Sequence, residues 1–312
     1  MKNFLVIIIC FTIVLLSVSN GFADEENGGQ GGAFLRIPVG ARPSGMGNAF
    51  VSIADDANVL YYNPGGLYQL HGMTVGAMYS VMSMDRSHYQ GSFIYEYEKY
   101  GTLGVMFTKF GISDIDGRDA QGNPTPSFDD SETAIAFGFG KKVLDRIGVG
   151  GTFKYISHSL KDNKATGIGI DVGAHSGFEI QKPIVQALSL KAVRVGFSLS
   201  NLGSSLEWDT ASSHKDDVPS TARIGTGLDL LYKDIGVLVA LEVSSTSNES
   251  MEFHTGVETW LYELLGLRLG ADGGNFDFGV SVLYNQFRFD YAFTTDVLEE
   301  GATSRIGVVV EL

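Results

Sequence analysis

The feature that most constrains this chain is a strict alternation of apolar residues with polar or small ones, repeated from Met73 to Leu312. Between residues 235 and 243, every odd-numbered residue is apolar, and Gly236, Ala240 and Glu242 lie between them. A period of two residues is typical of β-strands that have one apolar face. The pattern predicts an all-β chain of about fourteen antiparallel strands, centred on residues 74–81, 89–97, 103–107, 135–139, 147–155, 168–172, 193–197, 224–230, 235–243, 253–261, 265–269, 276–284, 287–293 and 306–312.

A soluble β-sandwich also alternates, so periodicity alone leaves that fold open. Two further features indicate that residues 72–312 form a transmembrane barrel and not a sandwich. Charged residues are confined to one face of the strands, which suits a wet lumen. The longest acidic connections, 111–131 and 202–219, follow the third and seventh strands, whereas short turns follow the second, eighth, tenth and twelfth. Outer-membrane barrels alternate long outside loops with short periplasmic turns in this way, although the connection 181–191 is longer than the rule predicts.

The first residues predict a secretory signal peptide over residues 1–23. Lys2 precedes an apolar run, 4–16, that is shorter than the roughly 20 residues a membrane-spanning helix needs, and small residues lead to Ala23. An uncleaved membrane anchor is the alternative. Cleavage would remove Cys10, the one cysteine of the chain, and would leave a formal charge of 21 − 36 = −15. So negative a chain argues against a nucleic-acid partner, because phosphates would be repelled.

Residues 24–71 do not alternate. The charged, glycine-rich start, 24–32, predicts a flexible segment. After it we expect short helices at 46–53 and 64–70, and a type II turn at Asn63-Pro64-Gly65-Gly66. Helices this short are not stable alone, and a barrel of fourteen strands is too wide to be filled by its own side chains. We therefore expect this stretch to plug the lumen as a hatch, with glycines in the strands leaving room for it.

Five motifs in this stretch are the most distinctive sequences of the chain: FLR at 34–36, GAR at 40–42, GMGNAF at 45–50, ADD at 54–56 and YNPGGL at 62–67. Together they resemble the N-terminal signature of the PorV/PorQ family of outer-membrane proteins, which is related to the FadL-type transporters of long-chain fatty acids. That family usually has Asn-Pro-Ala-Gly where this chain has Asn-Pro-Gly-Gly. The resemblance implies a fourteen-stranded barrel whose N-terminal segment folds into the lumen.

These motifs supply the candidate site residues, a hatch motif with a structural or gating role: Gly40, Arg42, Gly45, Met46, Gly47, Asn48, Asp55, Asp56, Asn63, Pro64 and Gly65. Arg42, Asp55 and Asp56 could contact a ligand carboxylate. We favour ion pairs with lumen charges instead, because charges shut away from bulk water need partners. The candidate partners are Arg194, Arg223, Arg268, Arg288 and Arg305. The ligand-binding residues themselves are not predicted.

Sites for catalysis or metal binding are not indicated by the sequence. The six histidines are scattered, none at the i, i+4 spacing of a zinc helix, and no G-x-S-x-G motif occurs. We therefore expect no enzyme activity, no metal site and no cofactor. The acidic segment 114–119 has glycine at its fourth position, whereas an EF-hand loop needs it at the sixth. We interpret it as a solvated loop facing lipopolysaccharide, with a divalent-cation site as the alternative.

Two functions are implied by the resemblance. The first is an outer-membrane protein of a Gram-negative-type bacterium that binds or passes hydrophobic small molecules, such as a fatty acid. The alternative is an interaction component of a type IX secretion system, which would carry secreted proteins to surface attachment. Outer-membrane lipid and lipopolysaccharide are expected partners in both cases. Transport predicts an apolar pocket between hatch and wall.

Overall fold

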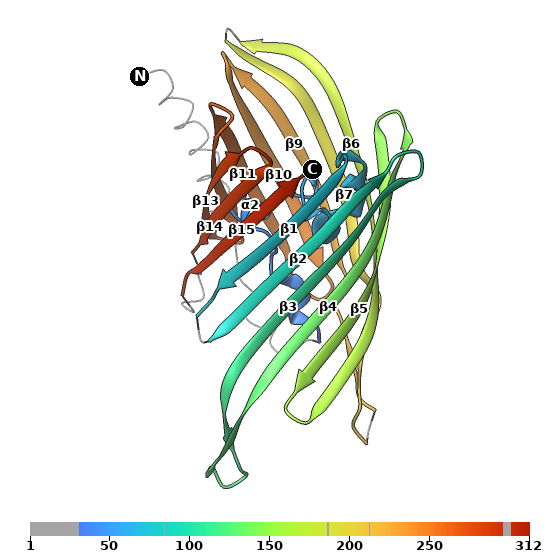
Figure 1. Ribbon diagram of the computed structural model, residues 1–312, viewed down its shortest axis with the longest axis vertical. Coiled ribbons are helices and arrows are strands. Elements are labelled where there is room, and N and C mark those ends of the chain that lie inside the picture. Colours follow the sequence, from blue (N-terminus) through green and yellow to red (C-terminus); the bar gives the residue numbers. More distant parts are fainter. Residues whose placement is uncertain (1–30, 84, 186, 212, 296–300) are drawn as a thin grey trace.

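The computed structural model describes residues 31–83, 85–185, 187–211, 213–295 and 301–312. Within these residues, long tilted strands surround a short N-terminal segment (Figure 1). The predicted signal peptide, 1–23, and residues 24–30 of the predicted flexible segment lie outside the described residues.

Fourteen strands of the described chain form a closed antiparallel barrel, as the sequence predicts. Neighbours in sequence are neighbours in the wall, and closure comes from the pairing of β1 with β15. A further short strand, β8, pairs only with the end of β7. The strands are β1 (Met73–Val81), β2 (Arg86–Tyr97), β3 (Gly101–Arg118), β4 (Pro124–Leu144), β5 (Ile147–Leu160), β6 (Asn163–Val185), β7 (Leu188–Trp208), β8 (Lys215–Asp217), β9 (Thr221–Tyr232), β10 (Ile235–Thr246), β11 (Met251–Leu261), β12 (Leu265–Asp272), β13 (Asn275–Tyr284), β14 (Phe287–Thr294) and β15 (Thr303–Glu311).

The two ends of the barrel differ in their connections. The short turns after β2, β9, β11 and β13 all lie at the end where β1 begins and β15 finishes. These are the second, eighth, tenth and twelfth strands of the wall, so the turns share one end as predicted. We call this the turn end; the C-terminus marks it in Figure 1. The opposite end, which carries the β3–β4 hairpin and the connection 209–220, is called the loop end.

Several strands are longer than the alternation predicts, so three expected connections are wrong. Residues 111–131 belong mostly to the β3–β4 hairpin, whose turn spans only 119–123. In the same way, 202–219 contains the end of β7 and all of β8, and 181–191 contains the ends of β6 and β7. Backbone pairing continues wherever amides and carbonyls can meet, whether or not one face is apolar. The pairing therefore extends past the region in which the side chains alternate.

Side chains of the wall point alternately outward and into the lumen. In β1, buried and exposed residues alternate along the strand, with Met78 and Ser80 buried and Tyr79 exposed. The outward residues form an apolar surface that suits lipid; they include Val75, Phe93, Val105, Phe107, Phe137, Phe139, Phe153, Ile170, Phe278, Phe289 and Tyr291. This is the one-sided distribution that the sequence predicts.

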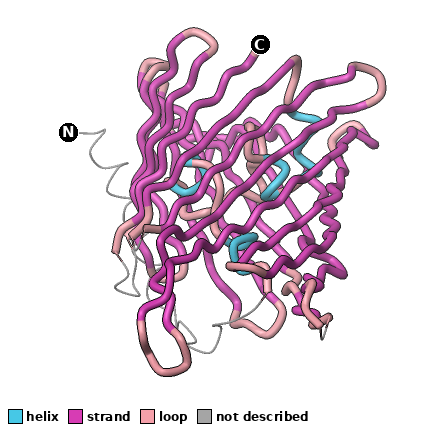
Figure 2. Tube along the Cα trace, turned by 60° about the horizontal axis from the view of Figure 1, so that its bottom comes forward, coloured by secondary structure: helices cyan, strands magenta, loops and turns pink. Residues whose placement is uncertain are grey.

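The N-terminal segment lies in the interior of the barrel and contains four short helices (Figure 2). They are η2 (Ala33–Arg36), α2 (Ala41–Ser44), α3 (Val59–Tyr62) and η3 (Pro64–Gln69). No helix in the described ranges has the length and apolar character needed to span a membrane.

The helix expected at 46–53 is wrong. Gly47 and Asn48 have φ of 61° and 58°, in the left-handed region, which ends α-helical geometry. The segment 64–70 is helical as expected, but as a 3₁₀-helix. The type II turn is also wrong, because neither Gly65 nor Gly66 has a positive φ. Asn63 instead caps η3, its side chain accepting a hydrogen bond from the Gly65 N–H at 2.9 Å.

Candidate functional site in the barrel lumen

The hatch, residues 31–71, lies inside the barrel and crosses it from the loop end to the turn end. Near the loop end, Phe34 of η2 packs with Phe110 and Leu206 of the wall. At the other end, the Met73 N–H donates to the Leu312 carbonyl at 2.8 Å, which joins the exit of the hatch to the last strand. The middle of the hatch contributes two apolar clusters against the wall, around Phe50 and Leu60.

Glycines of the wall face the hatch and let its backbone and side chains approach, as predicted. A Cβ added to Gly104 would lie 2.9 Å from Cδ1 of Leu60, and one added to Gly140 would lie 2.6 Å from Cβ of Leu67. Real Cβ atoms do not come this close to other atoms. At Gly140 the wall therefore needs a residue without a side chain, whereas at Gly104 the end of the Leu60 side chain would have to move.

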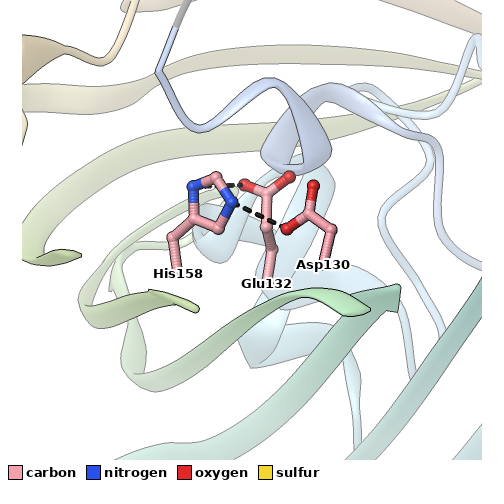
Figure 3. Close-up of side chains that lie close together, drawn as sticks. All are labelled: Asp130, Glu132 and His158. Atoms are coloured by element: carbon pink, nitrogen blue, oxygen red, sulfur yellow. Dashed lines mark hydrogen bonds and ion pairs between the residues drawn. The ribbon is translucent and has the colours of Figure 1, made fainter. Parts of the chain in front are cut away.

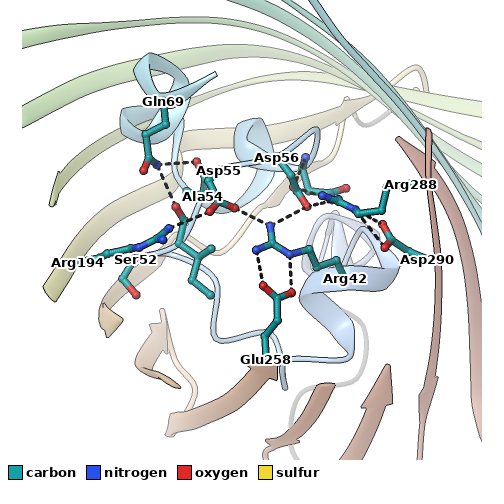
Figure 4. Close-up of polar contacts among 12 residues, drawn as sticks. Arg42, Ser52, Ala54, Asp55, Asp56, Gln69, Arg194, Glu258, Arg288 and Asp290 are labelled. Atoms are coloured by element: carbon teal, nitrogen blue, oxygen red, sulfur yellow. Dashed lines mark hydrogen bonds and ion pairs between the residues drawn. The ribbon is translucent and has the colours of Figure 1, made fainter. Parts of the chain in front are cut away.

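Arg42 joins the hatch to the wall (Figure 4). Its Nε and Nη2 donate to both oxygens of Glu258 on β11, at 2.8 and 2.9 Å. Its Nη1 donates to Asp55 of the hatch at 2.6 Å and lies 3.4 Å from Asp56. Bidentate pairing of a guanidinium with a carboxylate is among the strongest polar contacts in proteins. One cation thus ties together both acids of the ADD motif and the wall.

Asp55 and Asp56 each reach a second arginine from the wall. Arg194 on β7 donates to Asp55 at 2.9 Å, and Arg288 on β14 donates to Asp56 at 2.8 Å. The predicted ion pairing is confirmed for these two arginines. It is wrong for two others, because Arg223 pairs with Glu242 and Arg305 donates to Thr294. Arg268 is linked to this set of charges through Glu258, to which it donates at 2.5 Å.

We use the name hatch network for these charged residues and their outer partners, Asp229 and Asp290. Its members are Arg42, Asp55, Asp56, Arg194, Asp229, Glu258, Arg268, Arg288 and Asp290. Burial by itself would raise the pKa of Asp55, but the positive charges of Arg42 and Arg194 outweigh burial and leave that pKa lowered. Asp55 is therefore an anion at neutral pH. Arg42 and Asp56 are almost completely buried, so these charges are satisfied by each other and hold the hatch in one position.

Two carboxylates of the wall that hold the hatch were missed by the sequence reasoning. Glu242 on β10 accepts hydrogen bonds from the backbone N–H groups of Phe50 and Val51, both at 2.8 Å. Glu258 on β11 is the bidentate partner of Arg42. Both lie on lumen-facing positions of otherwise apolar strands, and this inward charge was a signal that could have identified them.

Asn63, Pro64 and Gly65 form a structural turn against the wall. The Asn63 side chain donates to the carbonyls of Val51 and Ala174, at 2.8 and 2.9 Å. A Cβ on Gly65 would lie 2.6 Å from Cα of Ala174, so glycine is needed here for close approach rather than for φ. The turn fastens the end of α3 to β6.

Of the remaining motif residues, Gly45, Met46, Gly47 and Asn48 lie against β11 to β13, whereas the Gly40 N–H donates to Sδ of Met78 on β1 at 3.0 Å. Gly40 has φ of 85°, and a Cβ added to Gly45 would lie 2.8 Å from Cα of Gly279. Met46 is fully buried, and Gly47 sits against the backbone of Thr255 and Ala271. Asn48 donates to Asp272 and lies within hydrogen-bonding distance of the Tyr62 hydroxyl. All eleven predicted residues therefore lie at contacts between the hatch and the wall.

The acidic segment 114–119 has local roles in the β3–β4 hairpin. Asp119 accepts from the N–H groups of Gln121 and Asn123, at 2.9 and 2.8 Å, and closes the turn. The Asn123 side chain also donates to Asp119 at 2.9 Å, and this hydrogen bond first, with the backbone ones, lowers the pKa of this exposed carboxyl group. The Asp114 N–H donates to Asp129 across the hairpin at 3.0 Å.

Two cavities adjoin between hatch and wall. The first, of about 30 Å³, has one apolar side formed by Phe34, Leu60, Met106, Ala134 and Ala136, and a polar side that includes Lys154, Asn201 and Arg223. The second, of about 290 Å³, is lined mainly by polar residues, among them Asn48, Glu252, His254 and Asp272. A volume of 30 Å³ corresponds to about one water molecule.

Tyr61 and Arg36 line both cavities. The hydroxyl of Tyr61 and Nε of Arg36 are buried, and neither has a hydrogen-bond partner among the described residues. Burial raises the pKa of Tyr61 to about 12, so its hydroxyl keeps its proton and can donate. Unpaired buried polar groups are costly, which marks this boundary as the place where a polar atom of a bound molecule would be stabilised.

Comparison with solved structures shows that the fold is shared with proteins described as toluene transporters. The toluene transporter TbuX of Ralstonia pickettii superimposes with a TM-score of 0.53 at 12% identity, over 87% of this chain and 97% of that chain. The toluene transporter TodX of Pseudomonas putida gives 0.55 at 11% identity, over 87% and 97%. No protein-family model and no curated protein sequence matches the chain. At such identities the likeness establishes the fold.

Proposed function

We propose that this chain is an outer-membrane barrel of the PorV/PorQ type that passes hydrophobic small molecules past its hatch. The observation that carries the proposal is the pair of adjoining cavities between hatch and wall, one of which has an apolar side. The fold is also that of proteins described as toluene transporters. In this proposal the hatch is the gate, and the hatch motif holds it against the wall in the closed state.

Tyr61 is the side chain whose movement would open the path. Ligand sites usually measure about 300–1,000 Å³, so the first cavity is too small as it stands and the second lies at the lower limit. Because Tyr61 lines both cavities, a displacement of the hatch that moves its ring aside would join them. The joined space would offer an apolar side for a hydrocarbon body, and Arg36 and Arg223 for a polar end.

The wall beside the first cavity offers an exit into the lipid. Asp171 and Asn201 line this cavity, and between their strands, β6 and β7, the register shifts at 168–170 and again at 170–172. Asn201 and Gly203 have φ of 59° and 63°, which bends β7 there. A ladder with shifted register has fewer hydrogen bonds to break, so this is where a hydrophobic molecule would leave the lumen sideways.

A disulfide between hatch and wall tests the gate. An ideal Cβ on Gly307 lies 3.7 Å from Cβ of Ala41, close to the roughly 3.8 Å of natural disulfides. Cells producing A41C/G307C should take up radiolabelled toluene or oleate only after reduction, whereas both single-cysteine variants should behave as the unmodified protein. Uptake by the oxidised variant at the unmodified rate would contradict gating by the hatch. Uptake no faster than in cells lacking the protein would contradict transport itself.

A second function, receiving secreted proteins for a type IX secretion system, is favoured by one surface. Ile180, Ile184 and Val185 are exposed near the tip of the β6–β7 hairpin, at the turn end. An apolar tip of this kind suits a protein partner. A photo-crosslinker at Ile184 should then capture secreted proteins that carry a conserved C-terminal sorting domain, with Glu98, in another turn of the same end, as the control position. Capture of none would contradict this role.

A further inference from the structure

One imidazole and two carboxylates converge on the lumen face near the loop end, apart from the hatch network (Figure 3). Asp130 and Glu132 are two residues apart on β4, so they share a face. His158 on β5 is directly opposite Glu132 in the strand register. One ligand atom of each side chain lies within 4.8 Å of the other two.

The two carboxylates of this cluster have too few positively charged partners to balance their charge. His158 Nε2 lies 2.8 Å from Asp130 Oδ1, and Nδ1 lies 4.0 Å from Glu132 Oε2. Within the part of the chain that the structure describes, neither acid forms an ion pair with lysine or arginine. With both carboxylates ionised, even a protonated imidazole leaves the cluster with a formal charge of 1 − 2 = −1.

Glu132 is the member that points most clearly to a missing ligand. Its exposed fraction is 8%, and among the described residues no donor forms a hydrogen bond with its carboxylate. Figure 3 shows this carboxylate between the His158 ring and the Asp130 carboxylate. His158 is its ion-pair partner at 4.0 Å, and a carboxylate this far withdrawn from water would be stabilised further by a cation at that point.

The surroundings hold the imidazole in place. The ring of Trp208 packs on that of His158, with centroids 5.0 Å apart, and the Trp208 indole N–H donates to Asp216 at 2.6 Å. Phe110 and Ala165 flank Glu132 and His158 on the neighbouring strands. An apolar surrounding strengthens the attraction between a cation and the carboxylates.

We propose that Asp130, Glu132 and His158 bind a divalent transition-metal ion such as Zn²⁺. Imidazole nitrogen together with carboxylate oxygens is a set that Zn²⁺ accepts, whereas Ca²⁺ takes six to eight oxygens. Zn²⁺ holds such atoms at about 2 Å, so the three side chains must close in by about an ångström. A bound ion would fasten β4 to β5 beside η2, where the hatch begins. This site is independent of the proposed transport.

Calorimetric titration with ZnCl₂ tests the site, using the full barrel in detergent without a polyhistidine tag and stripped by chelator. We expect one Zn²⁺ per chain. Glu132→Gln and His158→Asn should each weaken binding by at least about tenfold, since even outer partners of metal ligands have effects of that size. The matched control is His71→Asn, because His71 pairs with Glu96 on the exposed turn end and should not matter.

Failure to bind Zn²⁺ at millimolar concentration, or unchanged affinity in both variants, would overturn the proposal. If a variant does not fold, zinc K-edge absorption of the unmodified protein with bound Zn²⁺ serves as the test instead. That spectrum should show one imidazole with oxygen ligands. A shell of oxygens alone would refute the assignment.

Discussion

Replacing Arg42 with methionine should loosen the hatch without unfolding the barrel. Methionine keeps part of the apolar stem of arginine but removes the charge that Glu258, Asp55 and Asp56 share. The strands of the wall pair with one another and close without the hatch. The substitution therefore separates the seating of the hatch from the stability of the wall.

The magnitude follows from the hatch network. Its four arginines and five carboxylates carry a formal charge of 4 − 5 = −1, which becomes 3 − 5 = −2 in the variant. Removing one partner of a buried ion pair costs about 3–5 kcal/mol. Glu258, Asp55 and Asp56 each keep another arginine, so we expect the lower limit, about 3 kcal/mol. That corresponds to about a hundredfold more frequent opening of the hatch.

Hydrogen exchange measures this opening at the amides of Phe50 and Val51, which donate to Glu242. Their exchange should be about a hundredfold faster in Arg42→Met, while amides of β1 and β2 keep their rates. Arg118→Met serves as the control, because Arg118 lies in the exposed β3–β4 hairpin. Unchanged exchange at Phe50 and Val51 would refute the reasoning. So would equal acceleration in the strands, since hatch and wall would then open as one unit.

Three further predictions concern the same seat. Gly65→Ala places a Cβ 2.6 Å from Cα of Ala174 and should cost about 1–3 kcal/mol in hatch opening, measured by the same exchange; an unchanged rate would show that the turn can shift. Asn63→Ala removes the cap of η3 and should cost about 0.5–2 kcal/mol while leaving the heat resistance of the barrel intact; joint loss of both would contradict a role confined to the hatch. Because the pKa of Asp55 is lowered from 3.8, its stabilising effect is present above pH 3.8 and is lost as pH falls through the lowered value, so exchange corrected for intrinsic rates should stay level from pH 7 to 5 and rise only below about pH 4.

Sequence reasoning located the hatch motif because its residues are unusual for a strand. Arg194 and Arg288 could be predicted as partners of Asp55 and Asp56, since buried charges need opposite charges. Which arginine meets which acid could not be predicted. Arg223 and Arg305 are equally charged and also face inward, but they lie beside Glu242 and Thr294. Only the path of the hatch through the lumen distinguishes them.

The proposed metal site shows the same limit. His158 is 26 positions from Glu132 in the sequence, and no helical spacing links them. The register of β4 with β5 places them opposite each other. A search for ligand motifs within one segment therefore had no reason to connect them.

The sequence by itself determined the barrel, because a period of two residues, repeated along the chain with charge on one face, is compatible with few other folds. It also determined that the hatch, residues 31–71, lies inside, since a wide barrel needs filling and glycines line its strands. Strand length, the 3₁₀ form of η3 and the choice of ionic partners were decided by the tertiary structure. These depend on contacts between residues far apart in the chain, whose distances follow only when register and hatch path are both in place.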